Sequence, residues 1–254
     1  MGRLPPEGVP GEAVRPGGHR RGVLAVIPAY EAAELVGDVV AGALRHLPVL
    51  VVDDGSADDT SGAARAAGAE VARQEPNQGK GAALKRGFRL ALERGCEAVV
   101  TLDADGQHDP AEIPAFLGAW QTERSDLVIG VRDFTRMPPA RRVANTFARW
   151  TLSRVVGREI PDNQSGYRLL SRRLARHTLE IGESGYEFEV EMLLRCLRRG
   201  WPISWIPIRT IYEGAGSHIS PLEHAVRFGR MLIRAARAGR AGERPPASRR
   251  PGPS

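Results

Sequence analysis

Three short segments of this chain are almost wholly apolar, and patterns typical of helices separate them. They cover residues 23–30 (VLAVIPAY), 49–52 (VLVV) and 98–102 (AVVTL). A short apolar run without polar alternation is typical of a strand that is buried on both faces of a parallel sheet. Residues 35–47 lie between the first two runs and repeat apolar side chains at helical spacing. The alternation predicts an α/β fold with a mostly parallel central sheet flanked by helices and connected by right-handed crossovers.

The remaining segments continue this pattern, less regularly in the second half of the chain. Asp58, Asp59 and Thr60 are good N-cap residues and predict a helix after them. A helix near residues 141–156 has apolar positions at Val143, Phe147, Trp150 and Val155. Further helices are expected over 80–94 and 187–199, and further strands over 69–73, 126–130, 165–171 and 203–212.

Composition divides the chain into one domain and two tails. Residues 1–21 and 238–254 are rich in Pro, Gly and Arg, so we expect both to be disordered. Residues 22–220 form the expected domain, since 254 residues suit one large domain with tails. Residues 221–237 have the pattern of an amphipathic, basic helix.

Charge and cysteine content restrict the compartment and the partners. The net charge is +6 and favours anionic partners. Cys96 and Cys196 lie far apart without a CxxC pattern, which indicates a reducing compartment. No apolar stretch approaches the roughly 18 residues of a membrane span, and no secretory signal begins the chain, so we expect a cytoplasmic protein. The basic residues cluster in the tails and no RNA-binding aromatic motif occurs, so a nucleic-acid partner is not expected.

Two of the apolar runs end on pairs of aspartates. VLVVDDG ends on Asp53 and Asp54, and VVTLDADG ends on Asp103 and Asp105. Open α/β sheets bind their ligands at the carboxyl ends of the strands. Neighbouring carboxylates repel each other unless a cation lies between them, and a hard divalent ion that also holds a diphosphate meets that need. Gln107 continues the spacing of Asp103 and Asp105 and adds a neutral oxygen ligand. An Asx turn with helix capping is the structural alternative for Asp53 and Asp54.

A glycine-rich segment, NQGKGAALKRGF at 77–88, precedes an expected helix. Gly79 and Gly81 allow the backbone to approach a ligand closely, the helix N-terminus favours an anion, and Lys80 adds positive charge. A simple turn followed by a capped helix explains the same residues equally well. Asp109, which precedes Pro110, is interpreted as a structural N-cap.

Five blocks in order resemble the family 2 glycosyltransferases: VIPAYEAAE, VVDDGSADDT, NQGKGAALKRG, LDADGQHDP and DNQSGYRLLSRR. These enzymes have the GT-A fold, a Rossmann-like nucleotide-diphospho-sugar transferase fold. The likeness is greatest to the polyprenyl-phosphate (dolichyl-phosphate) mannosyl or glucosyl synthase branch, and it covers roughly residues 23–220. The resemblance implies an inverting enzyme that uses a nucleotide-diphospho-sugar, such as GDP-mannose or UDP-glucose, and Mg²⁺ or Mn²⁺.

The resemblance also implies roles for individual residues. GYEFEVEM at 185–192 departs from the family block at Glu189, where Gln is usual, and Ser217-His218 stands where many relatives have Ser-Lys. The resemblance implies that the nucleotide is bound by Pro28, Tyr30, Glu31, Asp53, Asp54, Lys80 and Asp103. The implied metal ligands are Asp103, Asp105 and Gln107, and the implied acceptor-phosphate residues are Arg132, Arg142, Ser165 and Arg168. The implied catalytic residues are Asp103, Asp105, Arg132, Asp162 and Glu191.

The acceptor decides which chemistry the site needs. A lipid phosphate is already anionic near neutral pH, since its second pKa is about 6, so it needs arginines rather than a strong base. Arg132, Arg141, Arg142 and Arg168 suit that task. A saccharide or small-molecule hydroxyl would instead need a carboxylate base such as Glu189 or Glu191. A nucleotide-binding module without catalysis is the remaining alternative.

A polyprenyl-phosphate acceptor requires contact with a membrane. The basic stripe of Arg227, Arg230, Arg234 and Arg237 along the expected helix 221–237 favours an anionic membrane surface. We therefore expect peripheral association with the inner face of the membrane. A terminal helix packed on the core is the alternative for this segment.

Overall fold

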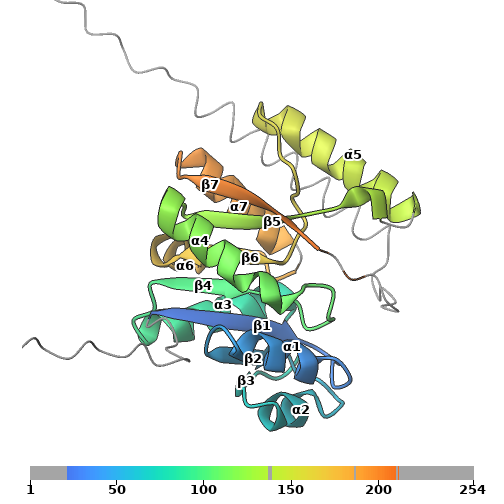
Figure 1. The fold of residues 1–254 in the computed structure, drawn as a ribbon, viewed down its shortest axis with the longest axis vertical. Coiled ribbons are helices and arrows are strands. Elements are labelled where there is room, and N and C mark those ends of the chain that lie inside the picture. Colours follow the sequence, from blue (N-terminus) through green and yellow to red (C-terminus); the bar gives the residue numbers. More distant parts are fainter. Residues whose placement is uncertain (1–21, 137–138, 186, 210, 212–254) are drawn as a thin grey trace, which may run out of the picture.

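A computed structural model describes residues 22–136, 139–185, 187–209 and 211 of the chain. One seven-stranded sheet with the order β3-β2-β1-β4-β6-β5-β7 forms the centre, and helices lie on both of its faces (Figure 1). The strands are β1 (Val23–Ala29), β2 (Val49–Asp53), β3 (Glu70–Arg73), β4 (Ala98–Thr101), β5 (Leu127–Arg132), β6 (Arg168–Ser171) and β7 (Ile203–Ile208). The helices are α1 (Val36–Leu44), α2 (Thr60–Ala66), α3 (Lys80–Glu93), α4 (Ile113–Glu123), α5 (Pro139–Val156), α6 (Arg172–Thr178) and α7 (Glu187–Arg198), with 3₁₀ turns at Pro110–Glu112 and Phe134–Arg136.

The sheet is parallel except for β6, which confirms the expected mostly parallel α/β architecture. β1 pairs in parallel with β2 and β4, and β5 pairs in parallel with β7. β6 lies between β4 and β5 and runs antiparallel to both. The carboxyl ends of β1, β2, β4 and β5 therefore share one edge of the sheet with the amino end of β6. Sequence patterns predict a strand near β6 but carry no sign of its direction, because pairing direction depends on distant segments.

Alternating side chains of each central strand enter two separate cores. Leu24 and Val26 of β1 pack in the layer of α3, α6 and α7, while Ala25 and Ile27 pack in the layer of α1, α2 and α4. Every residue of β1 is buried, which explains why this strand is a continuous apolar run.

Two expectations about the second half of the chain differ from the structure. Residues 172–178 form α6, which the sequence interpretation missed because the segment is short and carries three arginines. The apolar positions of α5 do not all face a core: Val143, Phe147 and Trp150 are exposed. In Figure 1, α5 lies at the end of the molecule opposite α2.

The expected tails, the expected helix 221–237 and Ser217-His218 lie outside the described residues. Within the described part of the chain, no helix is both long and apolar enough to cross a membrane.

Candidate functional site

Asp103, Lys80 and Glu189 meet at the carboxyl edge of the sheet. Asp103 follows β4, Lys80 is the first residue of α3, and Glu189 lies in the first turn of α7. The Lys80 Nζ atom lies 2.6 Å from Asp103 Oδ1 and 3.2 Å from Glu189 Oε1. One lysine thus joins two carboxylates from segments that are 86 residues apart in the sequence, 103 and 189.

Burial and charge act in opposite directions on these carboxylates. Burial alone would raise the pKa of Asp103, but the charge of Lys80 and the hydrogen bond from Lys80 hold it below its usual value. Burial keeps the pKa of Glu189 raised even though Lys80 and Arg168 oppose it. The lysine charge therefore favours the ionised form of Asp103, the carboxylate for which the family resemblance implies a role as metal ligand.

Asp105 completes the acidic pair after β4. Its Oδ1 atom accepts a hydrogen bond from the Gln107 N–H at 3.0 Å, which closes a tight turn. Burial and the neighbouring charge of Asp103 raise the pKa of Asp105. His108 is buried, which lowers its pKa, and its Nδ1 atom accepts the Asp103 N–H at 3.2 Å. His108 is thus a neutral support of the turn that presents the two carboxylates.

Arg132, at the end of β5, and Asp162, in the loop before β6, meet at the same edge of the sheet. Arg132 Nε and an Nη atom donate to the two Asp162 oxygens at 2.8 and 3.0 Å, a bidentate pair. Gly166 lies against Asp103, because a Cβ atom at this glycine would lie 2.5 Å from Asp103 Oδ2. Asn163 Nδ2 and Ser165 Oγ are buried without a hydrogen-bond partner among the described residues. Such atoms are costly unless a ligand or water satisfies them, which favours a polar ligand here.

Arg168 has a different environment from the one the resemblance implies. Its side chain is buried and donates to the carbonyl oxygens of Ser165 at 2.8 Å, Asn163 at 3.2 Å and Glu189. These bonds engage all three guanidinium nitrogens, so Arg168 fixes the loop before β6 against α7. In this arrangement the guanidinium of Arg168 is engaged by backbone carbonyls, and its contact with an acceptor phosphate stays a prediction.

Glu191 pairs with two arginines of its own helix. Its Oε1 atom lies 2.9 Å from an Arg198 Nη atom and 3.7 Å from Arg195 Nε, along the outer side of α7. Residues two apart on a helix point in different directions, so Glu189 and not Glu191 reaches Lys80. The sequence offered both glutamates, and only the placement of α7 distinguishes them. Arg142 is exposed on α5, and the side chain of Arg141 lies outside the described residues.

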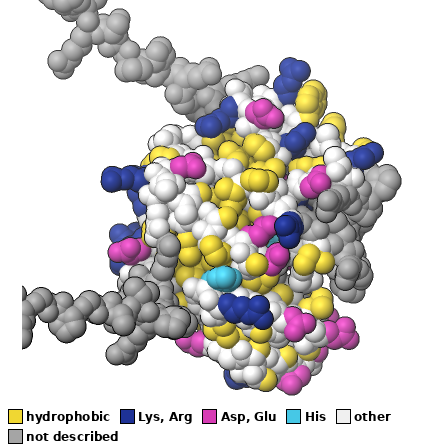
Figure 2. All heavy atoms as spheres, in the orientation of Figure 1, with side chains coloured by type: hydrophobic (Ala, Val, Ile, Leu, Met, Phe, Trp, Pro, Cys, Tyr) yellow, Lys and Arg dark blue, Asp and Glu magenta, His cyan; other side chains and the backbone are white. Residues whose placement is uncertain are grey.

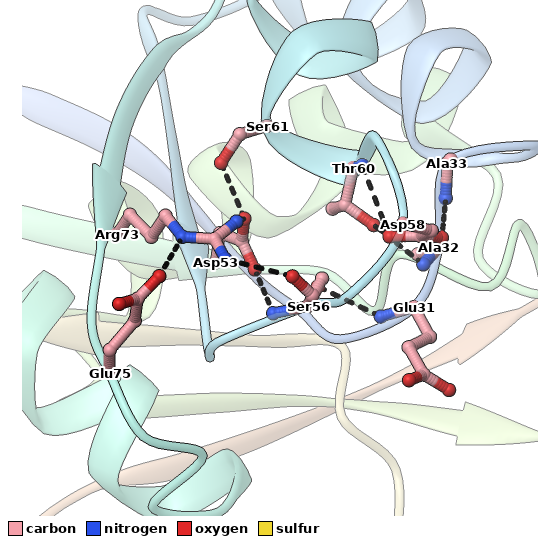
Figure 3. A network of polar contacts seen from close by, with 10 residues as sticks. All are labelled: Glu31, Ala32, Ala33, Asp53, Ser56, Asp58, Thr60, Ser61, Arg73 and Glu75. Carbon is pink, nitrogen blue, oxygen red and sulfur yellow. Dashed lines mark hydrogen bonds and ion pairs between the residues drawn. The ribbon is translucent and has the colours of Figure 1, made fainter.

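The loops after β1 and β2 are tied together by side chains at the adjoining part of the edge (Figure 3). The Glu31 N–H donates to Ser56 Oγ at 2.9 Å, and the Ala32 N–H donates to Thr60 Oγ1 at 2.8 Å. The Ala33 N–H donates to Asp58 Oδ2 at 3.0 Å. The sequence interpretation missed the role of Ser56, Asp58 and Thr60 in this contact, since it read the segment only as a helix start. The bonds fix the backbone beside Tyr30, which is half exposed.

Asp53 lies inside the network of Figure 3. Its carboxylate accepts from the Ser56 N–H at 2.9 Å, from Arg73 at 2.9 Å and from the Ser61 hydroxyl. These bonds overcome the effect of burial and lower its pKa. This geometry supports the turn-and-cap alternative for Asp53 over direct contact with a nucleotide.

Asp54 holds the glycine-rich segment in place. Its two oxygens accept the N–H groups of Gln78 and Gly79 at 2.8 and 2.7 Å and the Gln74 amide at 2.6 Å. At the start of α3, the N–H groups of Gly81 and Ala82 donate to the Ser184 carbonyl oxygen at 2.6 and 3.2 Å. In this conformation Gly79 and Gly81 lie against the backbone that precedes α7, since Cβ atoms at these positions would lie 2.7 and 2.8 Å from the Ser184 carbonyl oxygen. Close approach of a ligand to these glycines stays a prediction.

The donor set at Asp103 and Asp105 fits a hard divalent cation. Both residues offer carboxylate oxygens, and the repulsion that raises the pKa of Asp105 would be relieved by a cation between them. Within the described residues, no group of three His, Cys, Asp or Glu side chains is arranged to hold a metal by itself. Mg²⁺ usually takes only one or two protein carboxylates and completes its shell with waters and substrate phosphates. The arrangement therefore suits a metal that binds together with a diphosphate.

Residues 24–179 match the family model described as glycosyl transferase family 2. The chain belongs to the family 2 glycosyltransferases. An undecaprenyl-phosphate mannosyltransferase of Micrococcus luteus is 34% identical over 210 residues, which cover 76% of this chain and 85% of that protein. A polyprenol monophosphomannose synthase of Mycolicibacterium smegmatis is 32% identical over 210 residues, covering 73% and 76%.

The fold of this glycosyltransferase also resembles solved structures. Glucosyl-3-phosphoglycerate synthase from Mycobacterium tuberculosis, in complex with Mg²⁺ and uridine diphosphate, superposes with a TM-score of 0.66 at 23% identity. The superposition covers 86% of this chain and 79% of that one. The likeness establishes the GT-A fold that the five sequence blocks imply.

Proposed function

We propose that this glycosyltransferase moves a hexose from a nucleotide-diphospho-sugar to a polyprenyl phosphate. The observation that carries the proposal is the convergence of the Asp103–Lys80–Glu189 cluster with the Arg132–Asp162 pair at one edge of the sheet. Acidic residues for a metal diphosphate therefore lie beside an arginine for a second phosphate. The M. luteus relative is named an undecaprenyl-phosphate mannosyltransferase and the M. smegmatis relative a polyprenol monophosphomannose synthase, which supports the same acceptor class.

The donor side is formed by the loops after β1, β2 and β4. Tyr30 offers a half-exposed ring beside the tied loops, and a base packs well on such a ring. Pro28 is buried in β1 two residues before Tyr30, and Glu31 follows Tyr30 directly. Asp54 sets the position of Lys80 through the segment 77–79. Mg²⁺ or Mn²⁺ would be held by Asp103, Asp105 and Gln107 and would supply electrostatic stabilisation of the departing diphosphate.

The acceptor side is formed by Arg132, Asp162 and the loop that contains Ser165. Asp162 fixes the plane of the Arg132 guanidinium, which suits recognition of phosphate oxygens. In the reaction, an acceptor phosphate oxygen forms a bond to the anomeric carbon, and the bond from that carbon to the donor diphosphate breaks. The nucleoside diphosphate leaves with the electron pair. No proton has to move, since the attacking oxygen is already anionic.

Glu189 favours a second candidate, transfer to a saccharide or small-molecule hydroxyl. Its buried carboxylate has a raised pKa and lies within 3.2 Å of the lysine that contacts Asp103. A carboxylate of that kind is able to accept a hydroxyl proton. The two candidates differ in the solubility of the product.

A polyprenyl acceptor places the reaction at a membrane surface. We therefore propose peripheral, salt-sensitive association with the inner face of an anionic membrane. The net charge of +6 and the arginines of residues 221–254 support it.

Organic extraction after incubation with radiolabelled GDP-mannose or UDP-glucose, Mn²⁺ and undecaprenyl phosphate tests the proposed transfer. We expect label in the organic phase with one of the two donors. Asp105→Ala should lower this transfer at least about a hundredfold, because it removes a ligand that stabilises the leaving group. Asp38→Ala, an exposed aspartate on α1, is the matched control and should leave the rate unchanged.

Label that stays in the aqueous phase with every donor would refute the lipid acceptor. Label on a soluble sugar acceptor under the same conditions would favour the hydroxyl candidate. Full activity of Asp105→Ala would refute the metal assignment.

A further inference from the structure

Helix α5 exposes an aromatic face. Val143, Phe147 and Trp150 are 70%, 64% and 54% exposed, although each is a large apolar residue. Their spacing of four and three residues places them on one side of the helix. The Phe147 and Trp150 ring centroids lie 6.3 Å apart, so the two rings form one continuous surface. Among the described side chains of α5, Ala148 and Leu152 are buried and Val155 and Val156 pack partly against the core, so the core engages mainly the C-terminal half of this helix.

Basic side chains surround this face. Arg142 lines a hollow of about 500 Å³ together with Val143, Thr146, Phe147 and Trp150. The Arg154 guanidinium lies 5.3 Å from the centroid of the Trp150 ring. The sequence of α5 contains four arginines and no Asp or Glu. Figure 2 shows hydrophobic and basic side chains adjoining each other at the end of the molecule where Figure 1 places α5.

Charge discriminates between the possible occupants of the face. Residues 221–254 contain eight arginines against Glu223 and Glu243, so this segment repels a basic helix. A second copy of the chain would bring arginine to arginine in the same way. An anionic lipid surface complements both the arginines and the apolar side chains, since interfacial helices combine Trp, Phe or Leu with a basic flank.

We propose that this face of α5 docks on an anionic lipid bilayer, with Phe147 and Trp150 entering the headgroup region and the arginines contacting lipid phosphates. α5 begins seven residues after Arg132, the last residue of β5, at the edge that carries the acceptor side of the site. Docking would therefore bring that edge to the membrane. This link to catalysis rests on the proposed function, whereas the docking itself does not.

Vesicle flotation of the full-length protein tests the docking without any substrate. We expect binding to phosphatidylcholine vesicles that contain phosphatidylglycerol, loss of binding at high salt, and weak binding to phosphatidylcholine alone. The double variant Phe147→Ser/Trp150→Ser should lower the partition coefficient about tenfold, and Arg154→Gln about fivefold, as expected for interfacial side chains. The controls Leu35→Ser and Arg65→Gln change exposed residues on the opposite part of the molecule and should bind like the wild type.

Unchanged binding of the double variant would overturn the proposal and would place the contact elsewhere, such as in residues 221–237. A wild type that is dimeric and becomes monomeric in the double variant would also overturn it, because a second copy would then occupy the face. A wild type that binds vesicles through Phe147 and Trp150 but transfers no sugar would support the docking and refute the proposed function.

Discussion

At the residue scale, the site depends on side chains whose partners are distant in the sequence. The spacing of Asp103 and Asp105 after an apolar run is visible in the sequence, and the structure places both at the carboxyl edge of the sheet. The function of Arg168 is not visible there, because its three carbonyl partners belong to a loop and a helix that only the fold brings together. An arginine in a sequence pattern is equally compatible with a contact to a phosphate and with buried hydrogen bonds to backbone carbonyls.

Replacing Arg168 should destabilise the protein strongly. Arg168→Leu leaves the carbonyl oxygens of Asn163, Ser165 and Glu189 buried without donors, so we expect a loss of about 3 kcal/mol or more in the free energy of unfolding. Urea denaturation followed by circular dichroism measures this change. Arg172→Leu is the matched control, since this neighbouring arginine is exposed and should change stability by less than about 0.5 kcal/mol. Equal effects of the two substitutions would show that Arg168 does not act as a clamp.

At the scale of elements, α3 and α7 contact each other closely at Gly81. A Cβ atom at Gly81 would lie 2.7 Å from Phe188 Cβ and 2.8 Å from the Ser184 carbonyl oxygen. The same contact places Lys80 beside Glu189, so the packing of two helices builds part of the site. The sequence predicts both helices, but a glycine near a helix start is equally typical of ligand contact and of helix packing.

Gly81→Ala should therefore destabilise the junction between α3 and α7. We expect a loss of about 1–3 kcal/mol in the free energy of unfolding, because a methyl group is forced into a packed contact. Gly118→Ala is the control: nothing lies within 4 Å of its Cβ position in α4. Alanine favours a helix over glycine by about 1 kcal/mol, so this variant should be as stable as the wild type or more stable. Thermal unfolding of both variants compares them, and a stabilised Gly81→Ala protein would contradict the packing described here.

At the scale of the whole molecule, binding of the donor nucleotide with its metal should stabilise the folded protein against thermal unfolding. A ligand at about one hundred times its Kd stabilises the folded state by about 2.7 kcal/mol, which for a protein of this size raises Tm by about 5–10 °C. We expect this shift with either GDP or UDP in the presence of Mn²⁺, and the nucleotide that produces it identifies the donor base. Asp103→Asn should remove the Mn²⁺-dependent part, while Asp38→Asn on α1 retains it. The absence of a shift with both nucleotides would contradict the metal diphosphate site.

The sequence by itself determined the β/α alternation, the parallel first half of the sheet and the acidic ends of two strands. These features are local, since burial on both faces of a strand and the periodicity of a helix are written in consecutive residues. Only the tertiary structure decided that β6 runs antiparallel, that Glu189 rather than Glu191 reaches Lys80, and that Phe147 and Trp150 of α5 are exposed. Each of these depends on which distant segment lies opposite a residue, and hydrophobic periodicity specifies that a face is apolar without specifying what covers it.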